Sequence, residues 1–123
     1  MSIYPIIKMG HPTLRKVASP VAPSDIDRPE MHTLIADMVE TLHDAGGIGL
    51  AAPQIDRPIQ LAIIEVPGGP SRYGEIEAVP LTVFFNPVLT VVDPAEAGYW
   101  EGCLSVPGLR GFVHRPQHVR VDY

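Results

Sequence analysis

The sequence predicts an α+β fold, in which one N-terminal amphipathic helix is followed by short, mostly antiparallel strands. An apolar stripe with helical spacing lies between residues 30 and 45, and short apolar runs rich in branched side chains follow it. No further helical pattern separates these runs, which argues against a parallel α/β sheet. Fourteen prolines and eleven glycines indicate many turns and exclude a simple helical bundle.

Residues 1–23 are expected to form an extended arm that prolines punctuate. A turn is indicated at Gly10, His11 and Pro12, where we interpret His11 as a loop histidine. The apolar side chains of the arm are predicted to pack on the core, and they are Ile3, Ile6, Ile7, Leu14 and Val17.

The helix is predicted to begin at an Asp27 cap, with Pro29 in its first turn and Glu30 completing an Asp-x-x-Glu box. We expect Gly46 and Gly47 to end it, because glycine adopts the left-handed conformation at little cost. The apolar face of the helix recurs at steps of three and four residues, namely Met31, Leu34, Ile35, Met38, Val39 and Leu42.

A glycine-rich segment, 46–54, follows the helix. Its glycines and alanines leave the backbone unshielded, so a ligand or another strand can approach closely. It is neither a phosphate loop, which needs Gly-Lys-Ser/Thr, nor a dinucleotide fingerprint, which follows a strand. Strands are then predicted at 59–66, 81–85 and 88–92, with a loop over 67–80 and a further strand or pair near 112–113 and 119–121, interrupted at Pro116.

The composition is that of one globular domain of 123 residues. The net charge of -5 argues against a general nucleic-acid binder, which needs a basic face. The single cysteine, Cys103, excludes an internal disulfide and suits a reducing compartment. Because no targeting segment and no apolar run of about 20 residues is present, we expect a cytoplasmic location and no membrane partner.

Cys103 lies in the segment 101–105 (EGCLS), in a glycine-flanked bend beside a carboxylate and a hydroxyl. A cysteine placed there can be a nucleophile, a metal ligand or an inert core residue. Together with the segment 47–54 (GIGLAAPQ), it resembles the first two signature motifs of the peptide deformylases. The resemblance runs through both motifs in the right order, continues at Asn86-Pro87 and 106–111, and covers essentially the whole chain. Peptide deformylases are metal-dependent hydrolases that remove the N-formyl group from the initiator methionine of nascent proteins.

The resemblance implies the parts of a hydrolytic centre. Cys103 matches the thiolate that binds the catalytic metal, for which Fe(II) is expected and zinc, nickel or cobalt are alternatives. A bound metal lowers the pKa of its water and so provides hydroxide at neutral pH. The side-chain amide of Gln54 and the backbone N–H of Leu104 match the two donors to the formyl oxygen, and fixed donors of this kind stabilise a developing oxyanion.

The resemblance also implies how a peptide binds. Ile48 and Gly49 match residues whose backbone pairs with the substrate as an added strand, which depends little on side chains. Glu101 and Arg110 match positions near the mouth of the site, with structural or substrate-orienting roles. The implied partners are N-formyl-methionyl peptides and nascent chains, and the ribosome is a candidate partner.

The third motif of the family, His-Glu-x-x-His, supplies two imidazole ligands and the glutamate base from a C-terminal helix. This sequence lacks it, because none of its five histidines is followed by glutamate. His114 and His118 are four residues apart, but Pro116 and the neighbouring valines favour a strand, which places them about 13 Å apart. We therefore expect residues 1–123 to be a single, C-terminally truncated deformylase-like domain. It would be an incomplete deformylase fold without its C-terminal metal-binding helix, and inactive by itself.

Two alternatives stay open. A catalytically inactive paralogue would bind formyl-methionyl peptides without a stoichiometric metal and without turnover. A cysteine hydrolase would use Cys103 with His114 or His118, and alkylation of Cys103 would block it in metal-free protein.

Overall fold

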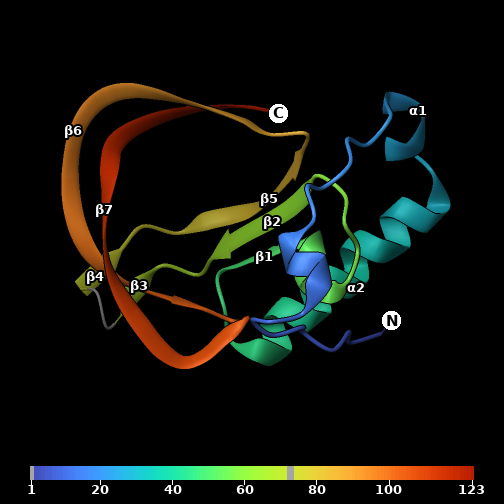
Figure 1. Ribbon diagram of the computed structural model, residues 1–123, viewed down its shortest axis with the longest axis horizontal. Coiled ribbons are helices and arrows are strands. Elements are labelled where there is room, and N and C mark those ends of the chain that lie inside the picture. The colour runs from blue at the N-terminus through green and yellow to red at the C-terminus, as the bar shows by residue number, and fades with distance from the viewer. Residues whose placement is uncertain (1, 72–73) are drawn as a thin grey trace.

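A computed structural model describes residues 2–71 and 74–123 (Figure 1). It confirms the α+β class, with one long helix and antiparallel strand pairs. The elements in chain order are η1 (Pro12–Arg15), α1 (Pro23–Ile26), α2 (Pro29–Ala45), β1 (Gly49–Ala51), η2 (Ala52–Ile55), β2 (Leu61–Val66), β3 (Gly69–Ser71), β4 (Gly74–Ile76), β5 (Val79–Phe85), β6 (Val88–Cys103) and β7 (Val106–Asp122). No helix of the described residues is long and apolar enough to cross a membrane.

The strands form three separate antiparallel groups (Figure 1). The central sheet has the order β1-β2-β5, with Leu50 opposite Ile63 and Leu61 opposite Phe85. β3 pairs with β4, and β6 pairs with β7. Because β1 is an edge strand of the central sheet, only one of its two sides pairs with β2.

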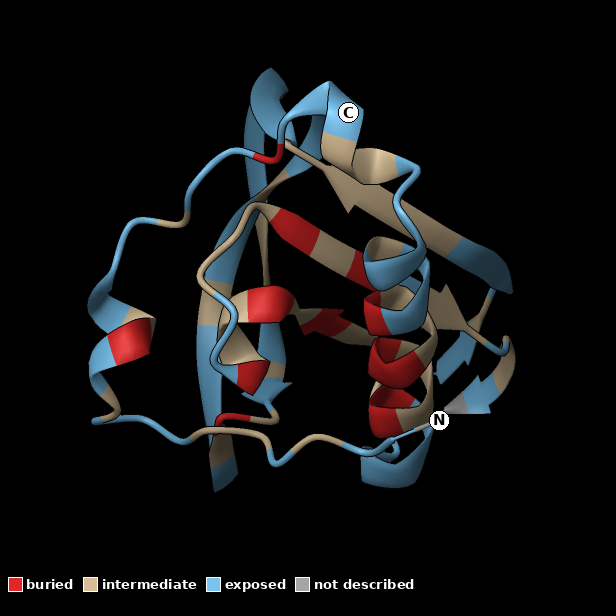
Figure 2. Cartoon of the chain, turned by 90° about the vertical axis from the view of Figure 1, so that its right-hand side faces the viewer, coloured by how far each residue is buried: buried red, intermediate tan, exposed pale blue. Residues whose placement is uncertain are grey.

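The core lies between α2 and the central sheet. Figure 2 shows buried residues along one face of α2, on β2 and on η2. Met38 and Ile63 are both 0% exposed, which makes them the centre of this contact. The buried cluster contains Leu34, Met38, Leu42, Leu50, Ala52, Ile55, Leu61 and Ile63. The helical face predicted from the apolar spacing therefore supplies one side of the core.

One end of α2 follows the prediction and the other does not. Gly46 has φ 69 and donates its N–H to His43 O, so the predicted glycine stop is confirmed. The predicted Asp27 cap with Glu30 is wrong, because the short helix α1 precedes α2 and Asp27 is the C-terminal cap of α1. Arg28 takes the N-cap position of α2 and makes no side-chain capping bond.

The N-terminal arm, residues 2–22, is extended as predicted apart from η1, and both hydrogen bonds and apolar packing hold it. Ile6 packs against the core cluster. The predicted packing of Ile3 and Val17 is wrong, since these side chains are 54% and 93% exposed. The arm is fixed near its end by Asn86, whose side chain accepts from the Val21 N–H (2.7 Å) and donates to Val21 O (2.8 Å).

The strands in the second half of the chain are much longer than predicted. β6 and β7 have 16 and 17 residues and form a long curved ribbon that bows away from α2 (Figure 1). Pro116 does not interrupt β7, because it lies opposite Glu96 at a register shift, where a missing N–H is tolerated. The predicted loop 67–80 contains the hairpin β3–β4, and residues 72–73 of that prediction lie outside the described residues.

Candidate active site

Gln54 lies on η2, directly after the edge strand β1, and three hydrogen-bonding groups orient its side chain. Its Oε1 accepts from the Ala51 N–H (2.9 Å). Its Nε2 donates to Ser105 Oγ (3.1 Å) and lies 3.8 Å from Cys103 Sγ. Because the oxygen is held by a donor of the backbone, the NH₂ group is the end of the amide that faces the cysteine.

Cys103 ends β6, and the turn at Leu104 and Ser105 leads into β7. The thiol is exposed in the described structure, which argues against an inert core cysteine, whereas Ser105 is only 4% exposed. The side chain of Leu104 packs on the core and explains the glycine at position 47. A Cβ on Gly47 would lie 2.9 Å from Leu104 Cδ1 and 3.1 Å from a Leu42 methyl.

A groove of about 880 Å³ runs between β1 and the turn that follows β6. Six of the seven predicted site residues line it, namely Ile48, Gly49, Gln54, Cys103, Leu104 and Arg110. The seventh, Glu101, lines an adjoining pocket of about 320 Å³, which also includes Cys103 and Arg110. Residues that are about 50 positions apart in the sequence are therefore gathered at one place.

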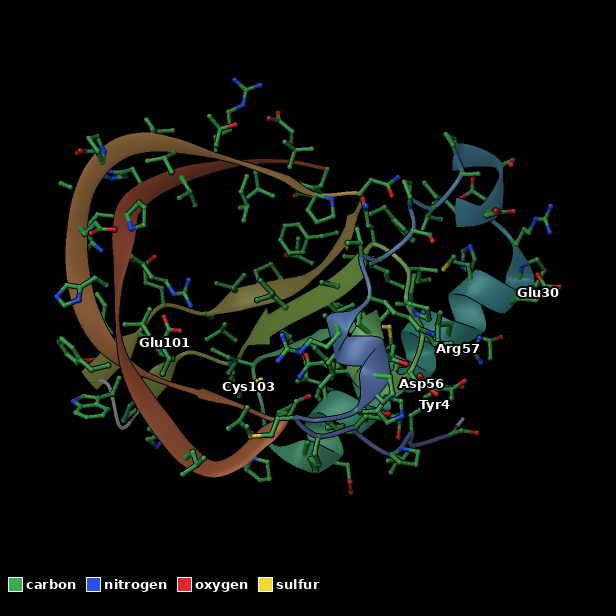
Figure 3. The ribbon with its side chains drawn as sticks, viewed as in Figure 1. Tyr4, Glu30, Asp56, Arg57, Glu101 and Cys103 are labelled. Atoms are coloured by element: carbon green, nitrogen blue, oxygen red, sulfur yellow. The ribbon has the colours of Figure 1, made fainter. Side chains whose placement is uncertain are left out.

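Glu101 is paired with Arg115 of β7, a partner that the sequence did not indicate. The two side chains form a bidentate ion pair, in which Arg115 Nε donates to Glu101 Oε1 and Arg115 Nη2 donates to Oε2 (2.7 Å). This hydrogen bonding, together with the positive charge of Arg115, lowers the pKa of Glu101 below its ordinary value. In Figure 3, Glu101 and Cys103 lie on the same side of the molecule, at the lower end of the ribbon.

The family of the chain follows from its similarity to known proteins. A family model described as polypeptide deformylase matches residues 3–123. The chain belongs to the polypeptide deformylase family. It is 49% identical over 117 residues to peptide deformylase 2 of Pseudomonas syringae pv. tomato, covering 95% of this chain and 65% of the relative. It is 41% identical over 123 residues to the peptide deformylase of Leptospira biflexa, covering 100% of this chain and 69% of the relative.

The fold of the deformylases is shared as well. The crystal structure of a class I type b peptide deformylase from Acinetobacter baumannii with bound Met-Ala-Ser superposes with a TM-score of 0.86 at 30% identity. The match covers 100% of this chain and 77% of that structure. The chain thus spans about two thirds of the curated deformylases it matches and about three quarters of this solved one.

The described side chains around Cys103 do not make up the donor set that the metal of the deformylase family requires. A catalytic metal usually takes three protein ligands. The described residues contain no group of three or more His, Cys, Asp or Glu side chains that could hold a metal ion. Cys103 offers one thiolate donor, while the nearby carboxylate of Glu101 is engaged by Arg115. This set is not a complete metal site, and no catalytic step through a metal follows from it.

The two histidines of β7 do not complete the centre. His114 lies opposite Gly98 and His118 opposite Asp93, whereas Cys103 lies opposite Val106. Gly98 is five residues from Cys103 along β6, a separation of about 17 Å at the usual rise of a strand. A hydrogen-bonded Cys–His pair is therefore out of reach, which argues against the cysteine-hydrolase alternative.

Ser105 and Arg115 are two of the site contacts that the sequence did not predict. Ser105 stood in the recognised motif, and its hydroxyl accepts from the Gln54 amide. Its place inside the motif was the one signal, because the burial that makes its hydroxyl need a partner is visible only in the structure. Arg115 had no such signal, since its contact with Glu101 depends on the register of β6 and β7.

Proposed function

We propose that this chain provides the peptide-binding edge, the oxyanion donors and one metal ligand of a peptide deformylase, which removes the N-formyl group from an N-terminal methionine. One observation carries the proposal. The NH₂ group of Gln54 points at Cys103 inside a groove whose wall is an unshielded edge strand. A hydrogen-bond donor, a thiol and a strand edge in one groove suit the hydrolysis of an amide at the end of an extended peptide.

The peptide is proposed to bind along β1. One side of β1 pairs with β2, with Gly49 opposite Ile64, and the other side faces the groove. Ile48, Val106 and Leu109 give the groove apolar walls, and Ile48 is 54% exposed. The deformylase of Acinetobacter baumannii was crystallised with Met-Ala-Ser bound. We propose that N-formyl-Met-Ala-Ser binds this chain by main-chain hydrogen bonds to Ile48 and Gly49, with its methionine against the apolar walls.

The formyl oxygen is proposed to accept hydrogen bonds from Gln54 Nε2 and from the Leu104 N–H. Gln54 Nε2 is prepared for this role, because Ala51 holds the other end of the amide. Its bond to Ser105 fixes the plane of the amide and leaves the second N–H directed toward Cys103. Donors fixed before the reaction begins need no reorganisation as charge develops on the oxygen.

Cys103 is proposed as one ligand of the metal, with iron(II) as the ion and zinc, nickel or cobalt as alternatives. Its exposure and its position in the groove support this role. Glu101 and Arg110 are proposed to shape the mouth of the site, with Glu101 held by Arg115. Two further ligands and a general base are needed for turnover, and the described residues do not form them.

Formate release from N-formyl-Met-Ala-Ser by the natural protein, measured together with its bound metal, tests this function. We expect Gln54→Ala to lower kcat by about 10²- to 10³-fold with little change in KM, because the lost donor acts in the transition state. Gln117→Ala, on the exposed face of β7, is the matched control and should leave kcat unchanged. Cys103→Ser is expected to lose the metal.

The outcomes separate the alternatives. Binding of the formyl peptide at β1 without formate release or metal, in the natural protein, would favour the inactive peptide-binding paralogue. Full activity in either Gln54→Ala or Cys103→Ser would contradict the proposed roles of these residues.

We further propose that the protein acts on nascent chains in the cytoplasm, close to the ribosome. An exposed thiol at Cys103 supports a reducing compartment, in which it stays available as a ligand. Co-sedimentation with translating ribosomes, compared with ribosomes that carry no nascent chain, tests this location. Equal recovery in the soluble fraction in both cases would contradict ribosome association.

A further inference from the structure

The N-terminal arm contacts both segments of the proposed oxyanion site. The Ile7 N–H donates to Gln54 O (2.8 Å), and the Met9 N–H donates to Ser105 O (2.9 Å). Lys8 Nζ lies 3.4 Å from Leu104 O. Three consecutive residues of the arm therefore reach the backbone of η2 on one side and the backbone of the turn after Cys103 on the other.

The arm is itself anchored a few residues later, at Thr13. This threonine is 4% exposed, and its Oγ1 donates a hydrogen bond to Asp56 Oδ1. Asp56 caps the end of η2 in the left-handed conformation, with φ 63, two residues after Gln54. A hydroxyl donor on a carboxylate makes a strong hydrogen bond. In the view of Figure 3, η1 of the arm lies between the labelled residues Asp56 and Cys103.

We propose that Thr13 and Asp56 are positioning residues for the oxyanion site. This inference rests on the proposed function, in which Gln54 and Leu104 both donate to the formyl oxygen. The two donors belong to elements that are distant in the sequence, so their separation must be set by whatever joins the elements. The Gln54 side chain joins them directly through Ser105, and the arm joins their backbones. The hydrogen bond between Thr13 and Asp56 links the arm to the C-terminal end of η2 as well.

A small displacement of either donor is expected to matter. A misplacement of about 1 Å in a catalytic site can cost about 100-fold in rate. Releasing the arm from Asp56 leaves the contacts of Ile7 and Met9 in place, so we expect a smaller effect, a loss of about tenfold in kcat. We expect KM to change by less than about twofold, because the oxyanion donors act mainly in the transition state.

The test uses two variants that remove the bond from opposite ends. Thr13→Val removes the hydroxyl at nearly constant volume, and Asp56→Gly removes the carboxylate while tolerating φ 63. Each is expected to lower kcat about tenfold, and the double variant to be no worse than either single one. Thr13→Ser restores the hydroxyl and should restore kcat.

A second readout does not depend on activity. The side-chain NH₂ of Gln54 and the backbone N–H of Leu104 are followed by ¹⁵N NMR in the same proteins. We expect both signals to shift in Thr13→Val and in Asp56→Gly, and to return in Thr13→Ser. Thr41→Val is the matched control, because Thr41 is 1% exposed and accepts from the Tyr4 N–H at the other end of the arm.

Three results would overturn the inference. They are unchanged kcat and Gln54 signals in both Thr13→Val and Asp56→Gly, equal changes in Thr41→Val, and additive losses in the double variant. If the natural protein releases no formate, the proposed function fails on that measurement. The NMR signals of Gln54 and Leu104 then still decide whether Thr13 and Asp56 position them.

Discussion

The two halves of the molecule are built on different principles. In the first half, α2, β1, η2 and β2 supply every residue of the buried core cluster. In the second half, no residue of β6 or β7 in the described structure is buried, and Figure 2 shows this ribbon in the colours of exposed and intermediate residues. The ribbon instead carries exposed apolar side chains, including Leu89 (70%) and Trp100 (59%).

Different contacts hold the two regions in the described residues. Strand pairing and surface contacts hold the ribbon, such as the Trp100 and Phe112 rings at 5.6 Å and the pair of Glu101 with Arg115. The core holds η2 by packing. The proposed site lies where the two halves meet, since Leu104 packs on the core and Ser105 is buried there. The ribbon is thus held at the site by Leu104 and Ser105, and at its other end by the Phe84 and Tyr123 rings at 4.6 Å.

The largest expected effect contrasts one core residue with one ribbon residue. Met38→Ala is expected to lower the free energy of unfolding by about 2–5 kcal/mol, because it removes a fully buried side chain and leaves a cavity. Leu89→Ala on β6 should change it by less than about 0.5 kcal/mol, because this side chain is mostly exposed. Urea unfolding measures both. A comparable loss in Leu89→Ala would show that the ribbon is packed rather than only paired.

An intermediate effect is expected at the contact between the halves. Gly47→Ala is expected to cost about 1–3 kcal/mol, because the new methyl group overlaps the Leu104 and Leu42 side chains. Gly49→Ala is the matched control, since its Cβ would be 3.5 Å from the nearest atom, and it should be neutral or slightly stabilising. Equal losses in the two variants would contradict this explanation, because Gly47 would then not be required by the close approach of the Leu104 side chain.

The smallest effect concerns the ion pair on the ribbon. Because Arg115 lowers the pKa of Glu101 below 4.5, the pair adds stability above that pH, and this stability is lost as the pH falls through the lowered pKa. In Arg115→Met, we expect the pKa of Glu101 to rise toward 4.5. An NMR titration of the Glu101 carboxyl carbon measures it. Arg120→Met, which removes the partner of Asp122, should leave that titration unchanged.

The sequence predicted what depends on local pattern. The apolar spacing around Met38 predicted the buried face of α2, and Gly46 predicted its end, because both signals act within a few residues. The start of α2 was mispredicted since α1 takes Asp27 as its own cap. The sequence predicts a break at Pro116, but whether a strand can contain a proline depends on how its partner strand pairs at that position. The pairing register of two strands depends on the tertiary structure, so the residues around Pro116 do not predict it.

In the candidate site, too, some features could be predicted from the sequence and others could not. Its residues were found because two motifs carry them, and the structure places Gln54 and Cys103 in one groove. Their roles remain proposals. The contacts of the arm had no sequence signal, because backbone N–H groups such as those of Ile7 and Met9 are present at nearly every position. Only the fold shows which carbonyl groups they reach.

The most direct measurement is an ¹⁵N NMR titration of the native protein with N-formyl-Met-Ala-Ser, beside unformylated Met-Ala-Ser. Gln54 comes from the packed half and Leu104 from the end of the ribbon, and the account requires both to meet the same formyl oxygen. The Gln54 side-chain NH₂ and the Leu104 N–H should therefore shift along one saturation curve with the formyl peptide, and much less without the formyl group. Saturable binding that moves the β1 signals but leaves Gln54 and Leu104 unchanged, or moves them equally with both peptides, would contradict it.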